Sequence, residues 1–383
     1  MQRAASLDAA INTAFAQGEY EQGLTALRTL GELLPDDADT QHRLAVVEEQ
    51  IGDPVRALNA HLSALTLSPT NSLAYLYAGY CLLQQGKTAR ALKIFSRGSD
   101  LDSQFLNPQP GTGPREERYL AASSALRGYL TSLHRSSVGD EPTTLRIRDA
   151  IWTRTHDQSY AFLQTQQIPQ LFYIPALEPS PYFATDTWHW ASGVEHNTAA
   201  ILEEFAAATQ LIDEQGRPYL SQGMAPDESL ATLAGSLNWT ALDLFRDGQA
   251  NVSVCEQFPQ TLSALSQVPL YGLDETPYEV FFSVLKPGQH ITPHYGLSNH
   301  SLTVHLPLIT PQPGHLTVNG EARRWESGKL IAFDDTYLHE AHNQSAEQRV
   351  VLIFSIWHPQ LSEPERLAIQ RSFIARQAWL SER

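Results

Sequence analysis

Leu302-Thr-Val-His-Leu-Pro-Leu-Ile309 and His315-Leu-Thr-Val-Asn-Gly320 are two short segments in which apolar residues recur at every second position. Such alternation over four to eight residues is typical of a half-buried β-strand, and Asn-Gly is typical of a tight hairpin turn. Both segments are therefore predicted strands, and the second ends in a hairpin turn.

Three further segments of the same kind surround these two. They are 278–285, which ends at a Pro-Gly turn, 329–333 and 349–357. Short strands with regularly spaced turn residues are typical of a β-sandwich or jelly roll. One helix is predicted before most of them, over 194–210, where apolar residues recur at helical spacing. The C-terminal part of the chain is therefore predicted to form a double-stranded β-helix, or jelly roll.

The first hundred residues repeat with a period of 34. Glycine recurs at 18, 52 and 86, a small residue at 23, 57 and 91, and leucine at 24, 58 and 92. Pro35 and Pro69 keep the same spacing, and each is predicted to end a helix because proline has no N–H to donate. This helix–turn–helix period resembles the tetratricopeptide repeat, and three repeats are predicted over roughly 4–103.

An α-helical tetratricopeptide solenoid offers a groove for a peptide or protein partner. The alternative is that these helices only pack against the rest of the chain or mediate self-association. A helical connector is predicted between the two patterned parts. The fold class is thus multidomain α + β, with repeats over 1–105, a connector over 106–170 and the jelly roll over 171–383.

Composition excludes several classes of protein. Lys and Arg number 26 against 42 Asp and Glu, a net charge of −16, so nucleic acid is not an expected partner. Two cysteines exclude a disulfide scaffold or a cysteine-rich zinc module and fit a reducing compartment. The sequence contains no run of about 18 apolar residues, so no membrane span is predicted. A cytoplasmic location is expected.

His294, His339 and Arg349 form the candidate site. His294 follows the Pro-Gly turn after 278–285, His339 follows 329–333, and Arg349 begins the last strand. Two histidines on opposed strands can hold one metal ion, and an arginine can bind an anionic co-substrate by a bidentate contact. This trio is typical of a non-haem Fe(II) oxygenase that uses 2-oxoglutarate. The alternative is ordinary polar residues at strand ends, because the chain has 14 histidines.

Residues 180–365 also contain a series of separate motifs. They are Asn238-Trp-Thr, the strand 278–285 with Lys286-Pro-Gly, Pro293-His-Tyr-Gly296, Ser298-Asn299, His305-Leu-Pro-Leu, Trp325-Glu-Ser-Gly328, Phe333-Asp-Asp-Thr-Tyr-Leu-His-Glu340, Asn343, Arg349 and Trp357-His-Pro359. Together these motifs closely resemble the aspartyl/asparaginyl β-hydroxylase family, in which tetratricopeptide repeats before the oxygenase domain are familiar.

The resemblance implies that His294 and His339 hold Fe(II). Most oxygenases of this chemistry carry a carboxylate ligand two residues after the first histidine, but this chain has Gly296 there. The same absence is characteristic of the family, in which water fills the vacant position. The reaction implied uses Fe(II), 2-oxoglutarate and O2 to hydroxylate a C–H group, with release of succinate and CO2.

The resemblance also implies a pocket for the co-substrate. Arg349 and Ser283 would bind the distal carboxylate of 2-oxoglutarate, and His305 would contribute to the same pocket. For Arg349 there is a physical reason as well, because a buried dianion needs a fixed cation.

Two positions depart from the pattern of the family. Arginine usually stands two residues, and often four, before the counterpart of His305, but this chain has Thr303 and Ser301. An arginine there would suit a carboxylate of the substrate or co-substrate, so its loss puts aspartyl side-chain recognition in doubt. Arg323 or Arg324 is a candidate substitute, or else the pair is solvated.

Three acidic residues beside His339 are candidate substitutes for the missing carboxylate: Asp334, Asp335 and Glu340. We expect the two aspartates to shape the turn and to support the metal ligands from outside. His342 is expected at the surface. The tryptophans of the region are expected in the core: Trp239, Trp325 and Trp357.

Three functions remain open. The first is a hydroxylase acting on an aspartyl, asparaginyl or related residue of a peptide that the repeats help to present. The second is an oxygenase of the same chemistry acting on a small molecule or a lipid acyl chain, which Thr303 favours. The third is a non-catalytic repeat scaffold, against which the retained His294, His339 and Arg349 argue.

Overall fold

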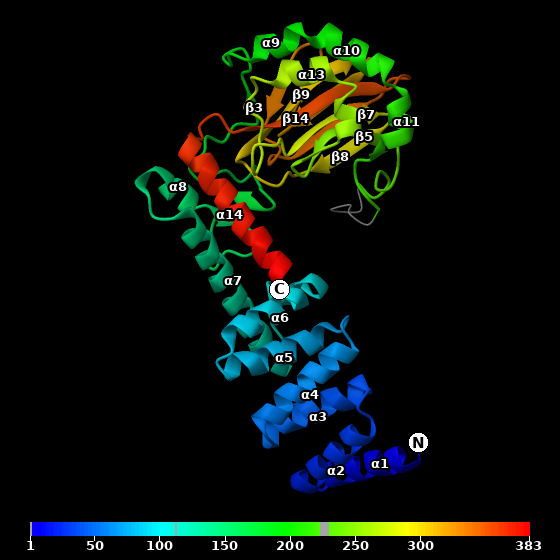
Figure 1. Ribbon diagram of the computed structural model, residues 1–383, viewed down its shortest axis with the longest axis vertical. Helices are drawn as coiled ribbons and strands as arrows, with labels where there is room; N and C mark the ends of the chain where they lie inside the picture. The colour runs from blue at the N-terminus through cyan, green and yellow to red at the C-terminus, as the bar shows by residue number, and fades with distance from the viewer. Residues whose placement is uncertain (1, 112, 223–229) are drawn as a thin grey trace. The chain divides into compact units, whose positions relative to one another are not determined.

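The computed structural model describes residues 2–111, 113–222 and 230–383 (Figure 1). Two compact units make up the chain. The helical unit comprises 1–132, 155–157 and 377–383, and the β unit comprises 133–154 and 158–376. This division into compact units does not test whether 106–170 acts as a connector, so the domain boundaries at 105 and 170 stay predictions.

The helical unit contains three helix–turn–helix repeats, so the predicted 34-residue period is confirmed. The small residues at 23, 57 and 91 and the leucines at 24, 58 and 92 are all buried. Pro35 and Pro69 lie just past the ends of α2 and α4. The helices of the repeats are α1 (Gln2–Ala16), α2 (Tyr20–Leu33), α3 (Ala38–Ile51), α4 (Pro54–Leu67), α5 (Ser72–Gln84) and α6 (Thr88–Leu101).

Local residues define the ends of these helices. Asp37 accepts a hydrogen bond from the N–H of Thr40 and caps α3, and Asp53 caps α4 in the same way. Gly86 turns the chain between α5 and α6 with φ of +71°, a conformation that favours glycine. The helices that follow the repeats are η1 (Ser103–Phe105), η2 (Gly113–Arg115), α7 (Glu116–Val138), η3 (Pro142–Thr144), α8 (Leu145–Arg148) and, near the C-terminus, α14 (Glu363–Glu382).

Two antiparallel sheets face each other in the β unit. The eight-stranded sheet has the order β3-β12-β9-β14-β7-β5-β4, with β6 paired to β5, and the four-stranded sheet has the order β11-β10-β13-β8. The strands of the larger sheet are β3 (Tyr182–Phe183), β4 (Arg217–Pro218), β5 (Trp239–Arg246), β6 (Gln249–Ala250), β7 (Glu279–Leu285), β9 (Ser301–Ile309), β12 (Ile331–Phe333) and β14 (Arg349–Trp357). Those of the smaller sheet are β8 (His290–His294), β10 (Gly314–Val318), β11 (Glu321–Arg323) and β13 (His339–Asn343). A separate pair is β1 (Ile151–Trp152) with β2 (Phe172–Tyr173).

Strand β14 lies at the centre of the β unit and is buried on both faces. Leu352 and Phe354 point into a core covered by α9, α10 and α13 (Figure 1). Val351 and Ile353 point the other way, into the core shared with the smaller sheet. The predicted jelly-roll architecture is thus confirmed, as two facing sheets that stay separate within the described residues rather than closing into a barrel.

The predicted single helix over 194–210 was wrong in its continuity. The chain forms α9 (Ala191–His196), α10 (Thr198–Ala207) and α11 (Gln210–Gln215), while α12 (Val252–Cys255) and α13 (Pro259–Leu265) follow later. At the first break, the side chain of Asn197 donates to the carbonyl oxygen of Gly193 at 2.8 Å. Asparagine competes for backbone hydrogen bonds in this way and so favours helix ends over helix interiors.

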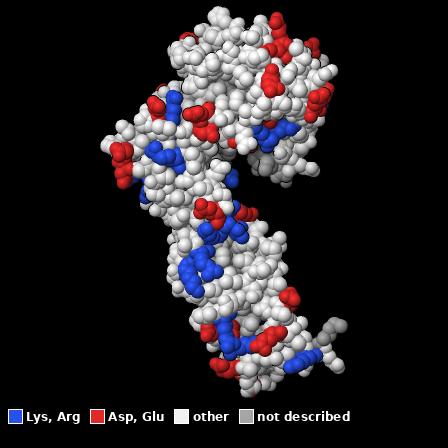
Figure 2. Space-filling view, viewed as in Figure 1, with Lys and Arg blue, Asp and Glu red and all other residues white. Residues whose placement is uncertain are grey.

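Charge and hydropathy on the structure agree with the composition. None of the described helices is long and apolar enough to cross a membrane. On the face drawn in Figure 2, the β unit carries scattered acidic groups and few basic ones. The described residues of that face form no continuous basic strip.

Close packing of the third repeat gives a first prediction. A Cβ at Gly79 in α5 would overlap the buried ring of Phe95 in α6, whereas a Cβ at Gly128 in α7 meets nothing within 4 Å. Gly79→Ala is expected to lower the free energy of unfolding by about 1–2 kcal/mol, because overpacking outweighs the gain in helix propensity. Gly128→Ala is expected to raise it by up to about 1 kcal/mol.

Urea unfolding of the helical transition, followed by far-ultraviolet circular dichroism, measures both changes. Equal stabilisation by the two variants would show that Phe95 does not pack against Gly79 as described.

Candidate active site

His294 and His339 lie side by side on the inner face of the smaller sheet. The two residues are paired across β8 and β13, and their ring centroids are 4.1 Å apart. Nδ1 of His294 lies 2.8 Å from the carbonyl oxygen of Thr292, and Nδ1 of His339 lies 3.0 Å from that of Tyr337. Hydrogen bonds of this kind place the proton of a neutral ring on Nδ1, so that Nε2 carries the lone pair that a metal ion needs.

The surroundings of His339 favour its neutral ring. Burial, together with the nearby His294, lowers the pKa of His339 to about 3. A neutral imidazole is the form that ligates a metal.

A bulge in β8 turns His294 into this position. In the pairing of β13 with β8, His339 lies opposite His294, Ala341 opposite Ile291 and His342 opposite His290. Two residues of β8, one of them Pro293, therefore oppose a single residue of β13. In a regular strand, positions 290 and 294 would share a face. Because of the bulge, His294 and the buried Ile291 face inward instead, while His290 faces outward.

Arg349 is a buried cation at the start of β14. It is 1% exposed, and its Nη2 donates to Oγ of Ser283 at 3.0 Å. The guanidinium lies over the ring of Trp325, 5.1 Å from the centroid. Among the described residues no carboxylate pairs with Arg349, and its Nε has no hydrogen-bond partner. Burial lowers the pKa of Arg349 to about 9, so it stays charged at neutral pH, and a buried charge is costly unless a partner compensates it.

Ser283 and His305 are oriented by two tryptophans. Oγ of Ser283 accepts from Nε1 of Trp239 at 3.1 Å, which leaves its own O–H as a donor. Nε1 of Trp325 donates to Nδ1 of His305 at 3.3 Å. Burial and then the charge of Arg349 lower the pKa of His305 well below its usual value, so the ring is neutral and its proton lies on Nε2. Both tryptophans are buried as expected, but sequence reasoning missed this second role.

One cavity of about 340 Å³ joins all the predicted site residues. Its lining includes His294, His339, Arg349, Ser283 and His305. Much of the remaining lining is apolar: Leu171, Leu220, Leu230, Leu273, Leu297, Ile353 and Phe373. His294, His339 and Arg349, which the sequence pattern predicted, thus lie around one cavity with Ser283 and His305, which the resemblance implied; the roles assigned to all five stay predictions.

The two aspartates of the 334–335 turn do different things. Asp334 accepts from the N–H of Thr336 at 2.9 Å and from Nε2 of Gln167 at 2.6 Å, and so shapes the turn as expected. Asp335 lines the cavity, and its carboxylate occupies the space that a Cβ at Gly296 would need. Glycine is thus the residue that fits at 296.

Thr303 and Ser301, where the family usually has arginine, both line the cavity. Oγ1 of Thr303 donates to Oδ2 of Asp335 at 3.2 Å. The proposed substitutes lie elsewhere: Arg323 pairs with the neighbouring Glu321 at 2.7 Å, and neither Arg323 nor Arg324 is part of the lining.

Asp335 gives a pH-dependent prediction for the metal-free protein. Burial, with the charges of Asp334 and Glu279, raises its pKa to about 8, whereas an unfolded aspartate titrates near pH 4, about its reference value. The folded state therefore holds a proton that the unfolded chain loses, so stability falls as pH rises from about 4 to 8. Asp335→Asn should remove this loss and become more stable than the wild type by roughly 2–5 kcal/mol at pH 8.

Urea unfolding of the metal-free chain at several pH values measures this difference, with the exposed Asp213→Asn as the charge control. A gain that is constant from pH 5 to pH 8 would contradict the prediction.

Known proteins resemble this chain over both parts. A sequence profile of the family described as aspartyl/asparaginyl beta-hydroxylase matches residues 195–359. Mouse aspartate beta-hydroxylase domain-containing protein 1 is 30% identical over 325 residues, covering 81% of this chain and 85% of that protein. Human aspartyl/asparaginyl beta-hydroxylase is 24% identical over 362 residues, covering 92% of this chain and 42% of that protein.

The chain thus spans less than half the length of the human protein. Among solved structures, the TPR2B domain of yeast Sti1 in complex with pHsp70 aligns with 32% of this chain and 98% of its own at 16% identity, with a TM-score of 0.27. The sequence matches are sufficient to assign the family: this chain belongs to the aspartyl/asparaginyl beta-hydroxylases.

Proposed function

We propose that this protein is an Fe(II)- and 2-oxoglutarate-dependent hydroxylase acting on an aspartyl, asparaginyl or related residue of a peptide or protein. One observation supports it above the others. Arg349 is a buried cation without a carboxylate partner among the described residues, and it lines the same cavity as the adjacent imidazoles of His294 and His339. A protein that keeps such a costly charge has a use for a bound anion.

The histidine pair fits a metal ion. His294 and His339 come from neighbouring strands, and the Nδ1 of each contacts a main-chain carbonyl that holds its ring orientation. Imidazole nitrogen is a good ligand for Fe(II). When bound, the iron would supply the oxidation, in which O2 converts 2-oxoglutarate to succinate and CO2 and a substrate C–H becomes C–OH.

The residues around Arg349 fit a dicarboxylate co-substrate. The guanidinium, the O–H of Ser283 and the Nε2–H of His305 are three donors in one cavity. Together they can bind the distal carboxylate of 2-oxoglutarate and hold it in one orientation. The apolar part of the lining excludes water from the reacting end.

The repeats give the proposal its substrate class. Three tetratricopeptide-like repeats precede the β unit, and repeat solenoids present extended surfaces that bind peptides. The human relative is named for aspartyl and asparaginyl residues. We therefore propose a peptide or protein substrate that the repeats help to bind.

A second candidate substrate is supported by Thr303. This residue and Ser301 replace the arginines usual in the family, and the cavity beside them has an apolar lining. An uncharged small molecule or a lipid acyl chain would suit such a site with the same chemistry. The two classes are separated by asking whether a peptide or an acyl compound stimulates succinate release.

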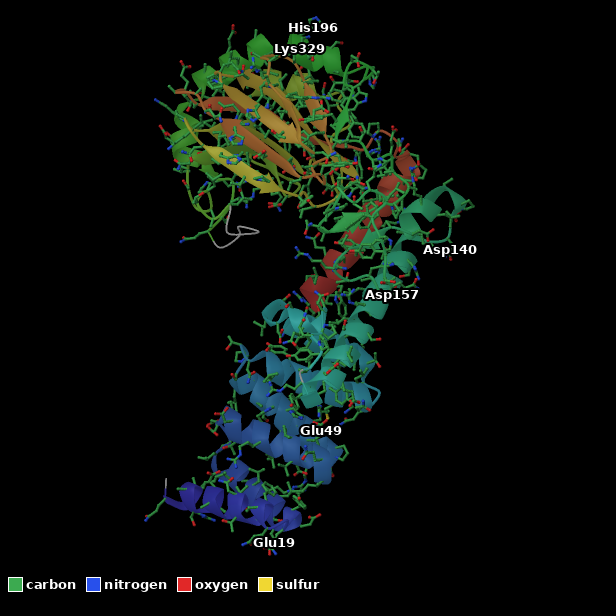
Figure 3. All side chains as sticks on the ribbon, turned by 180° about the vertical axis from the view of Figure 1, so that it is seen from behind. Glu19, Glu49, Asp140, Asp157, His196 and Lys329 are labelled. Atoms are coloured by element: carbon green, nitrogen blue, oxygen red, sulfur yellow. The ribbon has the colours of Figure 1, made fainter. Side chains whose placement is uncertain are left out.

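The enzyme class is tested by metal and co-substrate turnover. The full chain is loaded anaerobically with Fe(II) and 2-oxoglutarate, and succinate is measured after O2 is admitted. His339→Ala is expected to weaken Fe(II) binding about 100-fold and to abolish succinate release, because half of the imidazole pair is lost. His196→Ala, which removes an exposed histidine of α9 (Figure 3), is the matched control. Unchanged Fe(II) affinity in His339→Ala would disprove the assignment of the metal ligands.

The co-substrate assignment is tested at Arg349. Arg349→Ala should raise the apparent KM for 2-oxoglutarate by roughly 10- to 150-fold, which corresponds to the loss of a charge-assisted hydrogen bond of about 1.5–3 kcal/mol. Fe(II) affinity should change little. Arg324→Ala removes an exposed arginine and serves as the charge control. If the KM rises equally in both variants, Arg349 does not bind the co-substrate.

A further inference from the structure

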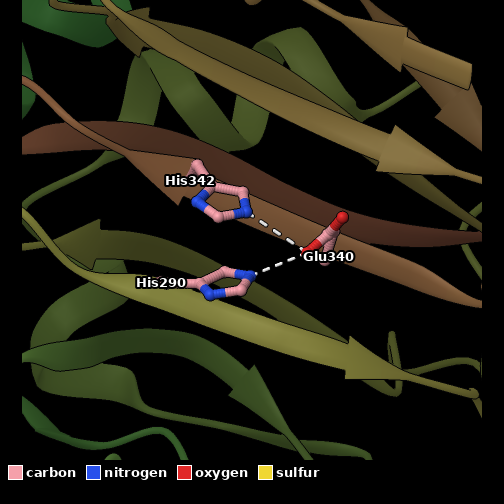
Figure 4. Close-up of side chains that lie close together, drawn as sticks. All are labelled: His290, Glu340 and His342. Atoms are coloured by element: carbon pink, nitrogen blue, oxygen red, sulfur yellow. Dashed lines mark hydrogen bonds and ion pairs between the residues drawn. The ribbon is translucent and has the colours of Figure 1, made fainter. Parts of the chain in front are cut away.

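Three more polar side chains lie together on the outer face of the smaller sheet (Figure 4). They are His290 of β8 and Glu340 and His342 of β13. His290 and His342 are a registered pair across the two strands. Their neighbours Ile291 and Ala341 point into the core between the sheets, so these two histidines face outward.

The nitrogens of both rings point at one carboxylate oxygen. Nε2 of His290 lies 2.8 Å, and Nε2 of His342 lies 3.2 Å, from Oε2 of Glu340 (Figure 4). The rings are stacked with centroids 3.5 Å apart and an angle of 19° between their planes. All three ligand atoms lie within 4.8 Å of one another. A tetrahedral zinc ion with bonds of about 2.0–2.2 Å separates its ligand atoms by roughly 3.3–3.5 Å, so small side-chain movements would admit it.

The exposure of the cluster fits an exchangeable ion. The side chains are 35%, 26% and 21% exposed for His290, Glu340 and His342. Ion pairs at this exposure contribute little to stability, so the convergence of three ligands is not explained by a large gain from pairing alone. Two imidazoles and one carboxylate form a donor set that zinc uses when it leaves a fourth position open to water.

The cluster lies on the same two strands as the candidate iron ligands. His290 lies four residues before His294 on β8, and His342 lies three residues after His339 on β13. An ion bound outside would therefore join the two strands that carry the candidate iron ligands inside. Glu340 also borders the cavity.

We propose that His290, Glu340 and His342 form a second metal site, which binds a divalent transition-metal ion such as Zn²⁺ and clamps β8 to β13. This site is separate from the pair His294 and His339, and its existence does not depend on the activity proposed above.

The test uses the full chain stripped of metal, in a background that carries His294→Ala and His339→Ala to remove the inner pair. Titration with Zn²⁺ against a chromophoric chelator is expected to show one equivalent bound. Adding His342→Ala should weaken that binding at least 100-fold, and adding Glu340→Gln, which keeps the shape of the side chain, should weaken it at least 10-fold. Adding His196→Ala should leave it within twofold.

Two outcomes would overturn the proposal: no Zn²⁺ bound by the background chain, or an affinity that His342→Ala leaves unchanged. If the background chain fails to fold, the comparison is made in the wild-type chain, where His342→Ala is expected to remove one equivalent of bound Zn²⁺; an unchanged stoichiometry would refute the second site. X-ray absorption of the zinc-loaded chain should show two imidazoles and oxygen ligands, and any other ligand set would contradict the assignment.

Discussion

A guanidinium buried between two sheets, with a serine hydroxyl and an indole face as its neighbours, is the constraint around which the β unit is built. Removing a charge from water is costly unless the structure provides compensation. Arg349 lies at the start of the central strand β14, next to β7, which supplies Ser283. The indole N–H of Trp239 and the ring of Trp325 hold this arrangement from the two sides. Within the described residues this compensation comes from hydrogen bonds and the indole face, and the anion proposed above would complete it.

The two facing sheets bring the histidine pair to the same cavity as Arg349. Alternate residues of β14 and β7 pack against the helices on one face, while Ser283 and Ile353 face the smaller sheet on the other. The smaller sheet contributes the histidine pair, and it does so through an irregularity. Without the bulge that includes Pro293, His294 would share the outer face with His290 and could not meet His339 inside the cavity. Pro293, which has no N–H to donate to a neighbouring strand, thus lies in the bulge that turns His294 inward and leaves His290 outward.

Sequence reasoning predicted the strands and named residues that the structure places around one cavity, but it did not predict the details that depend on strand register. Apolar residues at every second position predicted the strand 302–309, and a nearly continuous apolar run predicted 349–357, which is buried on both faces. The period of 34 predicted the repeats, because every unit buries the same positions. The bulge in β8 left no periodic signal in five residues, so neither the means by which His294 reaches the inner face nor the outer cluster around Glu340 could be predicted. Likewise, the position of Asp335 over Gly296 depends on the path of two loops that are far apart in sequence.

The net charge of the protein does not determine the charge inside its cavity, because the buried acids of the cavity have raised pKa values. The chain carries a net charge of −16, yet its cavity is proposed to bind a dianion. Three acidic residues line that cavity along with Arg349, and two of them, Asp335 and Glu279, are deeply buried. Burial raises the pKa of both, that of Asp335 to about 8, so Asp335 is mainly protonated at neutral pH. Arg349 then acts on a bound anion without an ionised Asp335 to oppose it.

The hydroxyl of Thr303 fits beside a neutral acid, whereas an arginine at this position would bring a second cation into contact with Asp335 and favour its ionised form. Thr303 and the protonated Asp335 therefore give this side of the cavity two hydrogen-bonding groups and no additional cation.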